Sequence, residues 1–350
     1  MMSKSMRAVV YRERGTFVLE ERPVPQIQAA TDAIVRVTLA SICSSDLHIK
    51  GGFVPRAVPG TIVGHEFVGI VEQVGDQVVS VRPGDRVAVN VETFCGHCFF
   101  CRRGFVNNCT DPNGGWALGC RIDGGQAEYV RVPYADNGLT KIPDPVTDRQ
   151  ALFTGDILST GYWAAQISQI QPEDTVLVLG AGPTGLCTMM CARLYQPAHI
   201  LVVEPDPDRR KLALARGWAD EAAASKDQAA ERLGQWTEGR GADVVLEVAG
   251  GGDTFQTAWQ LARPNGPVTV VAMYERPQVL PLPDMYGKNL TFKTGGVDAC
   301  HCGEILDLIA EGKLDPEPLI THTYPLERVM EAYDLFERKG DGVLKIAVQP

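Results

Sequence analysis

One early stretch of the chain gathers the residue types that are best suited to metal chemistry. Residues 43–48 read CSSDLH, and residues 64–66 read GHE after an apolar segment. A thiolate, an imidazole and a carboxylate together form a ligand set that suits Zn²⁺. Three protein ligands would leave the fourth position of the ion open, where it polarises a bound oxygen. Ser45, two residues after Cys43, could then lie beside that oxygen and take its proton. For each residue alone, a buried thiol or a hydrogen-bonded imidazole is the alternative.

A second group of thiols gives the strongest single signal in the sequence. Its members are spaced by two, two and seven residues: Cys95, Cys98, Cys101 and Cys109. Four thiolates close a tetrahedral shell around zinc and leave no open position, so the predicted role is structural. The metal would also help to fold a loop with little apolar content of its own. A redox-active Cys-x-x-Cys is the alternative, but two overlapping pairs and a fourth cysteine fit a metal better.

A glycine-rich turn predicts a binding site of a different kind. The apolar run TVLVL at 175–179 leads into GAGPTG at 180–185 and a helical run, and a second apolar run ends in Glu204. Such glycines allow a tight turn and the close approach of a pyrophosphate to a helix N-terminus. Glu204 lies 19 residues after Gly185, near the roughly 20 expected for an acid that accepts from a ribose hydroxyl. The residues predicted to contact the dinucleotide are Gly180, Gly182, Pro183, Thr184, Gly185 and Glu204.

The elements expected around these sites differ along the chain. Up to about residue 132, short runs rich in Val and Ile alternate with Gly and Pro turns, which is typical of a small barrel. From about residue 151, strands and helices alternate and supply about six strands for one doubly wound parallel sheet. The last fifty or so residues are too few for a domain, so we expect them to complete one of the other two.

Composition and charge exclude several classes of partner. The net charge of −10, from 33 basic and 43 acidic residues, argues against nucleic acid and against an anionic membrane. No early run resembles a signal peptide, and no run reaches the roughly 18 apolar residues that a membrane span needs. We therefore expect a cytoplasmic protein, in which the ten cysteines serve metal binding or catalysis rather than disulfides.

In their order along the chain, these motifs resemble those of the medium-chain zinc-dependent alcohol dehydrogenases. The resemblance covers nearly the whole chain and includes the sequence DILSTG at 156–161. It is nearest to the bacterial secondary-alcohol dehydrogenases, because Asp156 stands where the usual third zinc ligand is a cysteine. It implies a barrel-like (GroES-like) catalytic domain of residues 1–154 and 296–350, with a Rossmann coenzyme domain of residues 155–295 inserted between them.

The resemblance also implies a set of ligands for a catalytic zinc. Cys43, His65 and Asp156 would hold the ion, and Glu66 would join them when substrate is absent. Asp46 would accept a hydrogen bond from His65 and so fix its tautomer. An acid that caps the turn after Cys43 is the alternative for Asp46, and a helix N-cap is the alternative for Asp156.

Proton transfer and coenzyme contacts follow from the same resemblance. Ser45 would take the hydroxyl proton of the alcohol, and His48 would pass it to water by way of the nicotinamide ribose. Thr160 would pack against the nicotinamide ring, and Trp116 would line the substrate pocket. Arg209 matches a position that binds the adenosine ribose. A solvated loop histidine and plain core packing are the alternatives for His48 and Trp116.

The predicted reaction is reversible hydride transfer between a primary or secondary alcohol and NAD, with two zinc ions per chain. Glu204 favours NAD because a carboxylate repels the 2′-phosphate of NADP, although Arg209 could reach such a phosphate. A polyol or amino-alcohol dehydrogenase is the alternative within the family. We expect a homo-oligomer, either a dimer or a tetramer.

Other classes of protein fit the sequence less well. A zinc ribbon that binds nucleic acid would need a basic, aromatic-studded surface. A dehydrogenase fold without activity would not need the open ligand set or the pair of Ser45 and His48. The segment CHC at 300–302 could bind metal or react, although a loop near a subunit contact is the favoured interpretation.

Overall fold

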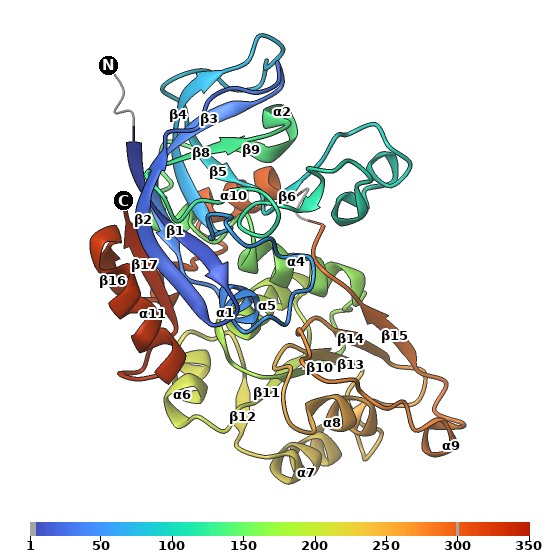
Figure 1. The fold of residues 1–350 in the computed structure, drawn as a ribbon. Helices are drawn as coiled ribbons and strands as arrows, with labels where there is room; N and C mark the ends of the chain where they lie inside the picture. Colours follow the sequence, from blue (N-terminus) through green and yellow to red (C-terminus); the bar gives the residue numbers. More distant parts are fainter. Residues whose placement is uncertain (1–4, 299–300) are drawn as a thin grey trace. The chain divides into compact units, whose positions relative to one another are not determined.

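The computed structural model describes residues 5–298 and 301–350 (Figure 1). The chain folds into two compact units. The first takes in the chain up to Ser159 and again from Asp298 onward, and the second is Thr160–Val297. Among the described residues, no helix has the length and apolar character that crossing a bilayer requires.

The first unit is built on a seven-stranded sheet. Its strand order is β16 (Ile320–Pro325), β17 (Lys345–Gln349), β3 (Ala33–Ser41), β4 (Phe67–Val74), β5 (Arg86–Val89) and β9 (Leu139–Lys141), with β8 (Tyr129–Val132) also paired to β3. Two smaller antiparallel pairs belong to the same unit, namely β1 (Ser5–Glu13) with β2 (Thr16–Pro23) and β6 (Glu92–Thr93) with β7 (Gly115–Trp116). Strand β3 is mostly buried, as its Val- and Ile-rich sequence predicts, and it forms the centre of this sheet.

The register of β3 and β4 brings the first chemical motif together. The strands are antiparallel, and Ala40 on β3 pairs with Phe67 on β4. The end of β3 therefore lies beside the start of β4, and the backbone N–H of Ser41 donates to the carbonyl of Glu66 at 3.0 Å. Residues that follow β3 and residues that precede β4 meet at this edge.

The second unit contains a six-stranded sheet in which all neighbouring strands are parallel. Its order is β12 (Glu221–Ala223), β11 (His199–Val203), β10 (Thr175–Leu179), β13 (Val244–Glu247), β14 (Pro267–Val270) and β15 (Thr291–Thr294). Numbered within the unit this is the order 3-2-1-4-5-6 of a dinucleotide-binding fold, which confirms the predicted doubly wound sheet. All five residues of β10 are buried, as expected for a central parallel strand.

The helices connect these strands. They are α1 (Ser44–Lys50), α2 (Ala135–Gly138), α3 (Asp148–Ala151), α4 (Ile157–Ile167), α5 (Pro183–Ala192), α6 (Pro207–Ala215), α7 (Lys226–Trp236), α8 (Thr254–Leu261), α9 (Leu282–Met285), α10 (Cys302–Ala310) and α11 (Val329–Arg338). Short 3-10 turns lie at Cys101–Arg103, Val106–Asn108, Arg193–Tyr195, Glu317–Leu319 and Leu326–Arg328.

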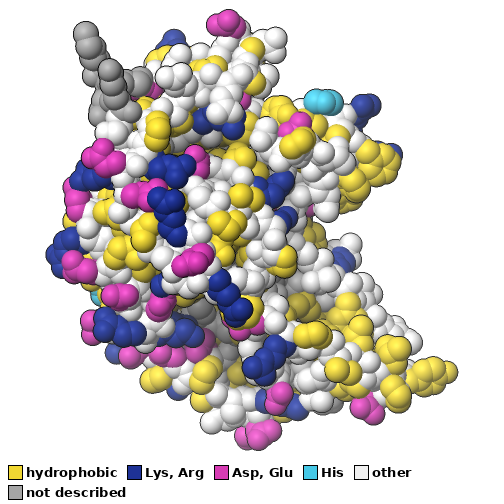
Figure 2. Space-filling model, in the orientation of Figure 1, with side chains coloured by type: hydrophobic (Ala, Val, Ile, Leu, Met, Phe, Trp, Pro, Cys, Tyr) yellow, Lys and Arg dark blue, Asp and Glu magenta, His cyan; other side chains and the backbone are white. Residues whose placement is uncertain are grey.

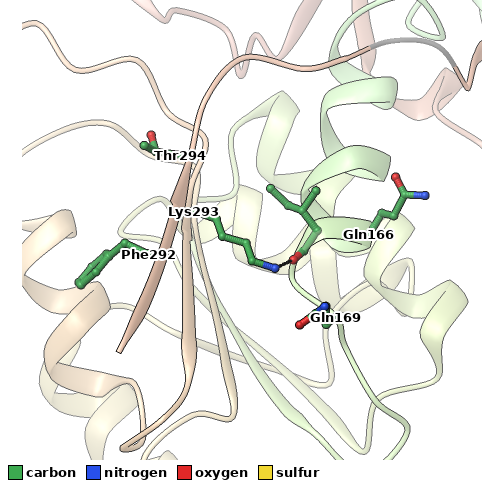
Figure 3. Close-up of a pocket in the computed structure, with 6 residues that line it drawn as sticks. Gln166, Gln169, Phe292, Lys293 and Thr294 are labelled. Carbon is green, nitrogen blue, oxygen red and sulfur yellow. Dashed lines mark hydrogen bonds between the residues drawn. The ribbon is translucent and has the colours of Figure 1, made fainter. Parts of the chain in front are cut away.

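A surface hollow lies in the second unit between the end of α4 and the edge strand β15 (Figure 3). Gln166 and Gln169 line it from one side, Phe292 and Thr294 from the other, and Lys293 donates to the carbonyl of Ile167 within it. None of the residues predicted to do chemistry lines this hollow.

Candidate metal centre and coenzyme turn

Three predicted ligands come together in the first unit. The Sγ of Cys43, Nε2 of His65 and a carboxylate oxygen of Asp156 all lie within 4.8 Å of one another. The Oδ2 of Asp156 is 3.4 Å from Nε2 of His65 and 3.6 Å from Sγ of Cys43. Tetrahedral ligands of zinc are expected about 3.3 to 3.8 Å apart, given Zn–N and Zn–S lengths near 2.0 and 2.3 Å. The residues present therefore fit a zinc ion.

Local backbone structure places each of these ligands. Cys43 is the N-cap of α1, and His65 lies just before β4, so the pairing of β3 with β4 sets their distance. Asp156 lies just before α4, and the glycine before it allows close approach to the end of β5. A Cβ at Gly155 would come within 1.8 Å of the carbonyl oxygen of Val89, so only glycine fits there.

The charges around the three ligands favour a cation. Burial lowers the pKa of His65, but the charge of Asp46 and the hydrogen bond to Asp156 raise it well above its usual value. Burial raises the pKa of the Cys43 thiol, although Lys345 acts in the opposite direction. A bound cation would take the place of the extra protons, because it stabilises both a thiolate and a neutral imidazole.

Asp46 stands behind the ligands as predicted for an orienting carboxylate. Its Oδ2 accepts from the backbone N–H of Cys43 at 2.9 Å, and its Oδ1 lies 3.2 Å from Nδ1 of His65. The ring N–H is not aligned for a linear hydrogen bond, yet the distance is that of an ion pair. Asp46 thus caps the first turn of α1 and also faces His65, so its position is compatible with both interpretations of this residue.

Ser45 lies beside the ligands, and His48 lies one turn further along α1. The Ser45 hydroxyl donates to Sγ of Cys43 at 3.1 Å and is 2.9 Å from Nε2 of His65. The ring of His48 is half-buried and packs edge-on against Phe53, with ring centres 6.3 Å apart. Ser45 is therefore placed to reach any group held at the three ligands.

Among the described residues, no oxygen of Glu66 belongs to the ligand cluster of Cys43, His65 and Asp156. Its Oε2 accepts from the Ser41 hydroxyl and from Nζ of Lys345. Lys345 also donates to the carbonyl of Ile42 at 3.0 Å and is fully buried. Sequence reasoning missed Lys345, because it lies on β17, and only the pairing of β17 with β3 brings it here.

Trp116 packs against the metal-site histidine, and a buried acid stands next to it. The rings of Trp116 and His65 are edge-on with centres 5.4 Å apart. Glu92 pairs with Trp116 across β6 and β7, so the two side chains share one face of the ribbon. Within the described part of the chain, Nε1 of Trp116 and Oε2 of Glu92 have no hydrogen-bond partner. The guanidinium of Arg56 lies 5.0 Å above the indole ring.

The four cysteines of the predicted structural site form a second cluster, which lies within the first unit. Their sulfur atoms all lie within 4.8 Å of one another. The Sγ atoms of Cys95 and Cys101 are 4.0 Å apart, and those of Cys98 and Cys101 are 3.4 Å apart. Sulfurs around a tetrahedral zinc are expected about 3.8 Å apart. Backbone N–H groups of Cys101 and Thr110 lower the pKa of Cys98 to about 5, so this thiol ionises readily.

The glycine-rich turn has the backbone that the sequence predicts. Gly180 has a φ of +103°, and a Cβ at Gly185 would come within 2.1 Å of the carbonyl oxygen of Gly180. Open space surrounds the position of a Cβ at Gly182 within 4 Å, and Pro183 is the first residue of α5. The N-terminus of α5 is therefore open to a ligand, with Thr184 in its first turn.

Glu204 is held tightly beside this turn. It is buried, its Oε2 accepts from the backbone N–H of Ala181 at 2.7 Å, and its Oε1 accepts from that of Asp206 at 3.0 Å. Arg209 is half-buried in the first turns of α6. Thr160 is half-buried on α4. Sequence reasoning missed Arg210, which donates to the carbonyl of Glu204 at 2.6 Å.

The segment at 300–302 is only partly described. Cys300 lies outside the described residues. His301 lies 3.4 Å from Glu304, and Cys302 is buried at the start of α10 with its Sγ 3.8 Å from the carbonyl of Thr154. Neither belongs to a metal-ligand cluster among the described residues.

Two family models match the chain. The alcohol dehydrogenase GroES-like domain matches residues 29–144, and the zinc-binding dehydrogenase model matches residues 183–304. Together with the parallel sheet, these matches confirm the predicted fold class of a GroES-like domain with a Rossmann domain.

Known relatives agree with these matches. The zinc-type alcohol dehydrogenase B of Aspergillus flavus is 36% identical over 342 residues, which cover 95% of this chain and 78% of that protein. The alcohol dehydrogenase from Thermus sp. ATN1 is 37% identical, with a TM-score of 0.89 over 98% of this chain and 99% of that one. A relative from Escherichia coli CFT073 was solved with NADH; it is 30% identical, with a TM-score of 0.89 over 99% and 100% of the two chains. A zinc-binding dehydrogenase from Sinorhizobium meliloti 1021 was solved with NADP. It is 26% identical, with a TM-score of 0.88 over 99% of this chain and 100% of that one.

Proposed function

The chain belongs to the medium-chain zinc-dependent alcohol dehydrogenases, and on that basis we propose that it oxidises a small alcohol reversibly by hydride transfer to NAD. The product is an aldehyde or a ketone. The observation that carries the proposal is the meeting of Cys43, His65 and Asp156 beside the hydroxyl of Ser45. An open set of three ligands is what a catalytic zinc needs.

The ligand set and its support define what the chain contributes to the chemistry. Zinc, when bound, supplies a Lewis acid that lowers the pKa of an alcohol hydroxyl. Cys43, His65 and Asp156 hold it, and Asp46 fixes the ring of His65 so that Nε2 carries the lone pair. Glu66 is a further proposed ligand, which would have to leave its contacts with Ser41 and Lys345 to reach the ion.

Proton removal falls to two residues of α1. Ser45 accepts the hydroxyl proton of the substrate, since its Oγ already lies beside two of the ligands. His48 stands three residues further along the helix, on the same face, and passes the proton to solvent.

The coenzyme site is proposed at the N-terminus of α5. The turn formed by Gly180, Gly182, Pro183, Thr184 and Gly185 would receive the pyrophosphate. Glu204 would accept from the ribose hydroxyl, Arg209 would lie along the adenosine and Thr160 would pack on the nicotinamide. Glu204 supports NAD, because its charge opposes a 2′-phosphate; relatives solved with NADH and with NADP do not decide between them.

A polyol or amino-alcohol dehydrogenase is a second candidate. The observation that favours it is that Oε2 of Glu92 and Nε1 of Trp116 are buried and have no hydrogen-bond partner among the described residues. Polar groups beside the metal site would suit a substrate with a second hydroxyl or amino group. A primary or secondary monoalcohol would leave them unsatisfied.

We also propose that residues 1–154 and 296–350 form the catalytic domain and that residues 155–295 form the coenzyme domain. The chain is further proposed to act as a homo-oligomer. Strand β15 is a mostly exposed edge of the parallel sheet. In and beside α9, Val279, Leu282 and Tyr286 are exposed, with Tyr286 93% exposed. Figure 2 shows apolar side chains gathered on this part of the surface. Exposed edges and apolar patches of this kind favour pairing with another copy.

One assay tests the proposal as a whole. Purified protein is supplied with NAD or NADP and with primary, secondary and polyhydric alcohols, and coenzyme reduction is followed by absorbance while zinc is counted per chain. We expect two zinc ions, a preference for NAD and turnover of at least one alcohol class. Zinc at the four cysteines alone, with no alcohol oxidised, would refute the proposal.

A further inference from the structure

A chain of buried hydrogen bonds runs from helix α11 to Asp46, which faces His65 of the metal centre. The hydroxyl of Tyr333, on α11, donates to Oε1 of Gln126 at 2.7 Å. Nε2 of Gln126 donates in turn to Oδ2 of Asp46 at 3.2 Å and to the carbonyl of Ser41 at 3.0 Å. Oδ1 of Asp46 lies 3.2 Å from Nδ1 of His65.

The chain of donors and acceptors can run in only one direction. Oδ2 of Asp46, which already accepts from the backbone N–H of Cys43, and the carbonyl of Ser41 are acceptors, so the amide NH₂ of Gln126 must face them. Oε1 of Gln126 therefore faces Tyr333, which must donate. Burial and then the charge of Asp46 raise the pKa of Tyr333 well above its usual value, so the hydroxyl keeps its proton.

Burial makes this chain rigid. Tyr333, Gln126 and Asp46 are all 0% exposed, and His65 is 1% exposed. Gly64 leaves the space for Gln126, since a Cβ at Gly64 would come within 2.5 Å of Cγ of Gln126. Hydrogen bonds that water cannot reach are stronger than exposed ones, and a missing partner costs more.

Gln126 controls how Asp46 faces the histidine. Oδ2 of Asp46 accepts both from the backbone N–H of Cys43 and from Gln126. Two donors on one oxygen fix the carboxylate plane and leave Oδ1 for Nδ1 of His65. The proton of the ring then stays on Nδ1, and Nε2 is directed toward the other ligands.

We propose that Gln126 and Tyr333 are positioning residues for the metal centre, acting on His65 through Asp46. The inference rests on the proposed function, since it takes Cys43, His65 and Asp156 as metal ligands. A role in core packing alone is the competing explanation, because Tyr333 also packs edge-on against Phe17, with ring centres 5.2 Å apart.

The test is Tyr333→Phe, which removes one hydroxyl and keeps the ring. Loss of metal to a chelator is followed in the purified protein, with the zinc of the four cysteines as internal reference. Mutation of a residue that hydrogen-bonds directly to a metal ligand typically lowers the affinity for the metal by about 10- to 100-fold. Tyr333 is more distant, so we expect metal to leave the proposed catalytic site roughly 3- to 10-fold faster in this variant. After replacement of that metal by Co²⁺, the visible absorption bands should also shift.

A matched control separates positioning from packing. Tyr11 packs edge-on against the same Phe17, with ring centres 5.8 Å apart, and it makes no contact in this hydrogen-bond chain. Tyr11→Phe should leave both the release rate and the Co²⁺ spectrum as in the wild type. In the double variant Tyr333→Phe with Gln126→Leu, the effects should not add, because the two side chains act as one chain.

Three outcomes decide the matter. Faster release and a shifted spectrum for Tyr333→Phe but not for Tyr11→Phe would support the proposal. The same behaviour in both tyrosine variants would overturn it while the metal centre stood. A wild-type protein that takes up metal only at the four cysteines would refute the proposed function, and this inference with it.

Discussion

Ser45 is the residue whose position most directly supports proton transfer. Its Oγ is 2.9 Å from Nε2 of His65 and donates to Sγ of Cys43. We expect Ser45→Ala to lower kcat by about 10²- to 10⁴-fold, the usual contribution of a proton-transfer group. NAD affinity, measured by fluorescence titration, should change little. Ser44→Ala, at the exposed first position of the same helix, is the control, and wild-type turnover by Ser45→Ala would disprove the role.

Glu204 should determine which coenzyme is used. Its carboxylate is fixed by the N–H groups of Ala181 and Asp206, so it cannot swing away from a 2′-phosphate. We expect Glu204→Gly to reduce the ratio of kcat/KM with NAD to that with NADP by about 10- to 100-fold, since a charged hydrogen bond contributes about 1.5 to 3 kcal/mol. Asp208→Asn, an exposed change in the first turn of α6, should leave the ratio unaltered. A native enzyme that uses both coenzymes equally would contradict this prediction.

Glu92 should make stability depend on pH. Burial raises its pKa well above the usual value, while the charges of Arg56 and Arg121 oppose this and those of Asp298 and Asp156 add to it. Between the unfolded and the folded pKa the native state holds the extra proton, so stability falls as pH rises, by about 1.4 kcal/mol per pH unit.

The substitution Glu92→Gln removes that titration. In thermal unfolding measured from mildly acidic to mildly alkaline pH, the midpoint of this variant should fall less than that of the wild type. Glu13→Gln, at an exposed position, should follow the wild-type curve. Parallel curves for wild type and Glu92→Gln would show that Glu92 is ionised in the folded protein.

Site residues could be predicted where they lie close together in the sequence or recur at a fixed spacing. The four cysteines and the glycine-rich turn are short segments, and the structure brings each group together. Lys345, Gln126 and Tyr333 carry no such signal. They reach the metal centre only through strand pairing and helix packing between distant segments, which spacing along the chain does not encode.

Among the elements, the segment of residues 95–109, which holds the four clustered cysteines, should depend most on a metal for its structure. Its 3-10 turns, Cys101–Arg103 and Val106–Asn108, are too short to be stable alone, and Phe99 and Phe105 are exposed. We expect Cys98→Ser to reduce zinc from two ions to one per chain and to make this segment sensitive to proteolysis, while metal at Cys43 stays. Cys187→Ala, on α5, is the control. Two zinc ions retained in Cys98→Ser would contradict a four-thiolate site.

The parallel sheet could be predicted element by element, whereas the sheet of the first unit could not. Strands and helices alternate regularly from β10 to β15, and parallel strands with helical crossovers admit few orders. In the first unit β17 lies between β3 and β16, and β8 and β9 return to the sheet after long loops. Short antiparallel strands with variable connections have many possible partners. The periodicity of the sequence therefore predicts that these segments are strands, but it does not predict their order in the sheet.

For the whole molecule, the testable question is assembly. The exposed apolar side chains near α9 lie in the same unit as the open edge strand β15. We expect Leu282→Asp combined with Tyr286→Asp to lower the mass measured by light scattering to a smaller assembly. Val79→Asp replaces another highly exposed apolar side chain, 87% exposed and in the first unit, and should not change the mass. A wild-type protein that is monomeric would overturn the proposed homo-oligomer.

The placement of Lys345 on β17 has a consequence for synthesis. The second unit is continuous in sequence, whereas the first is interrupted by it and resumes at Asp298. A growing polypeptide therefore has the whole parallel sheet available before the ribosome makes the lysine that neutralises Glu66. Cys43 and His65 must wait, without their final sheet neighbour, until β17 has been translated. The nascent protein should thus acquire its coenzyme fold first and a charge-balanced metal pocket last.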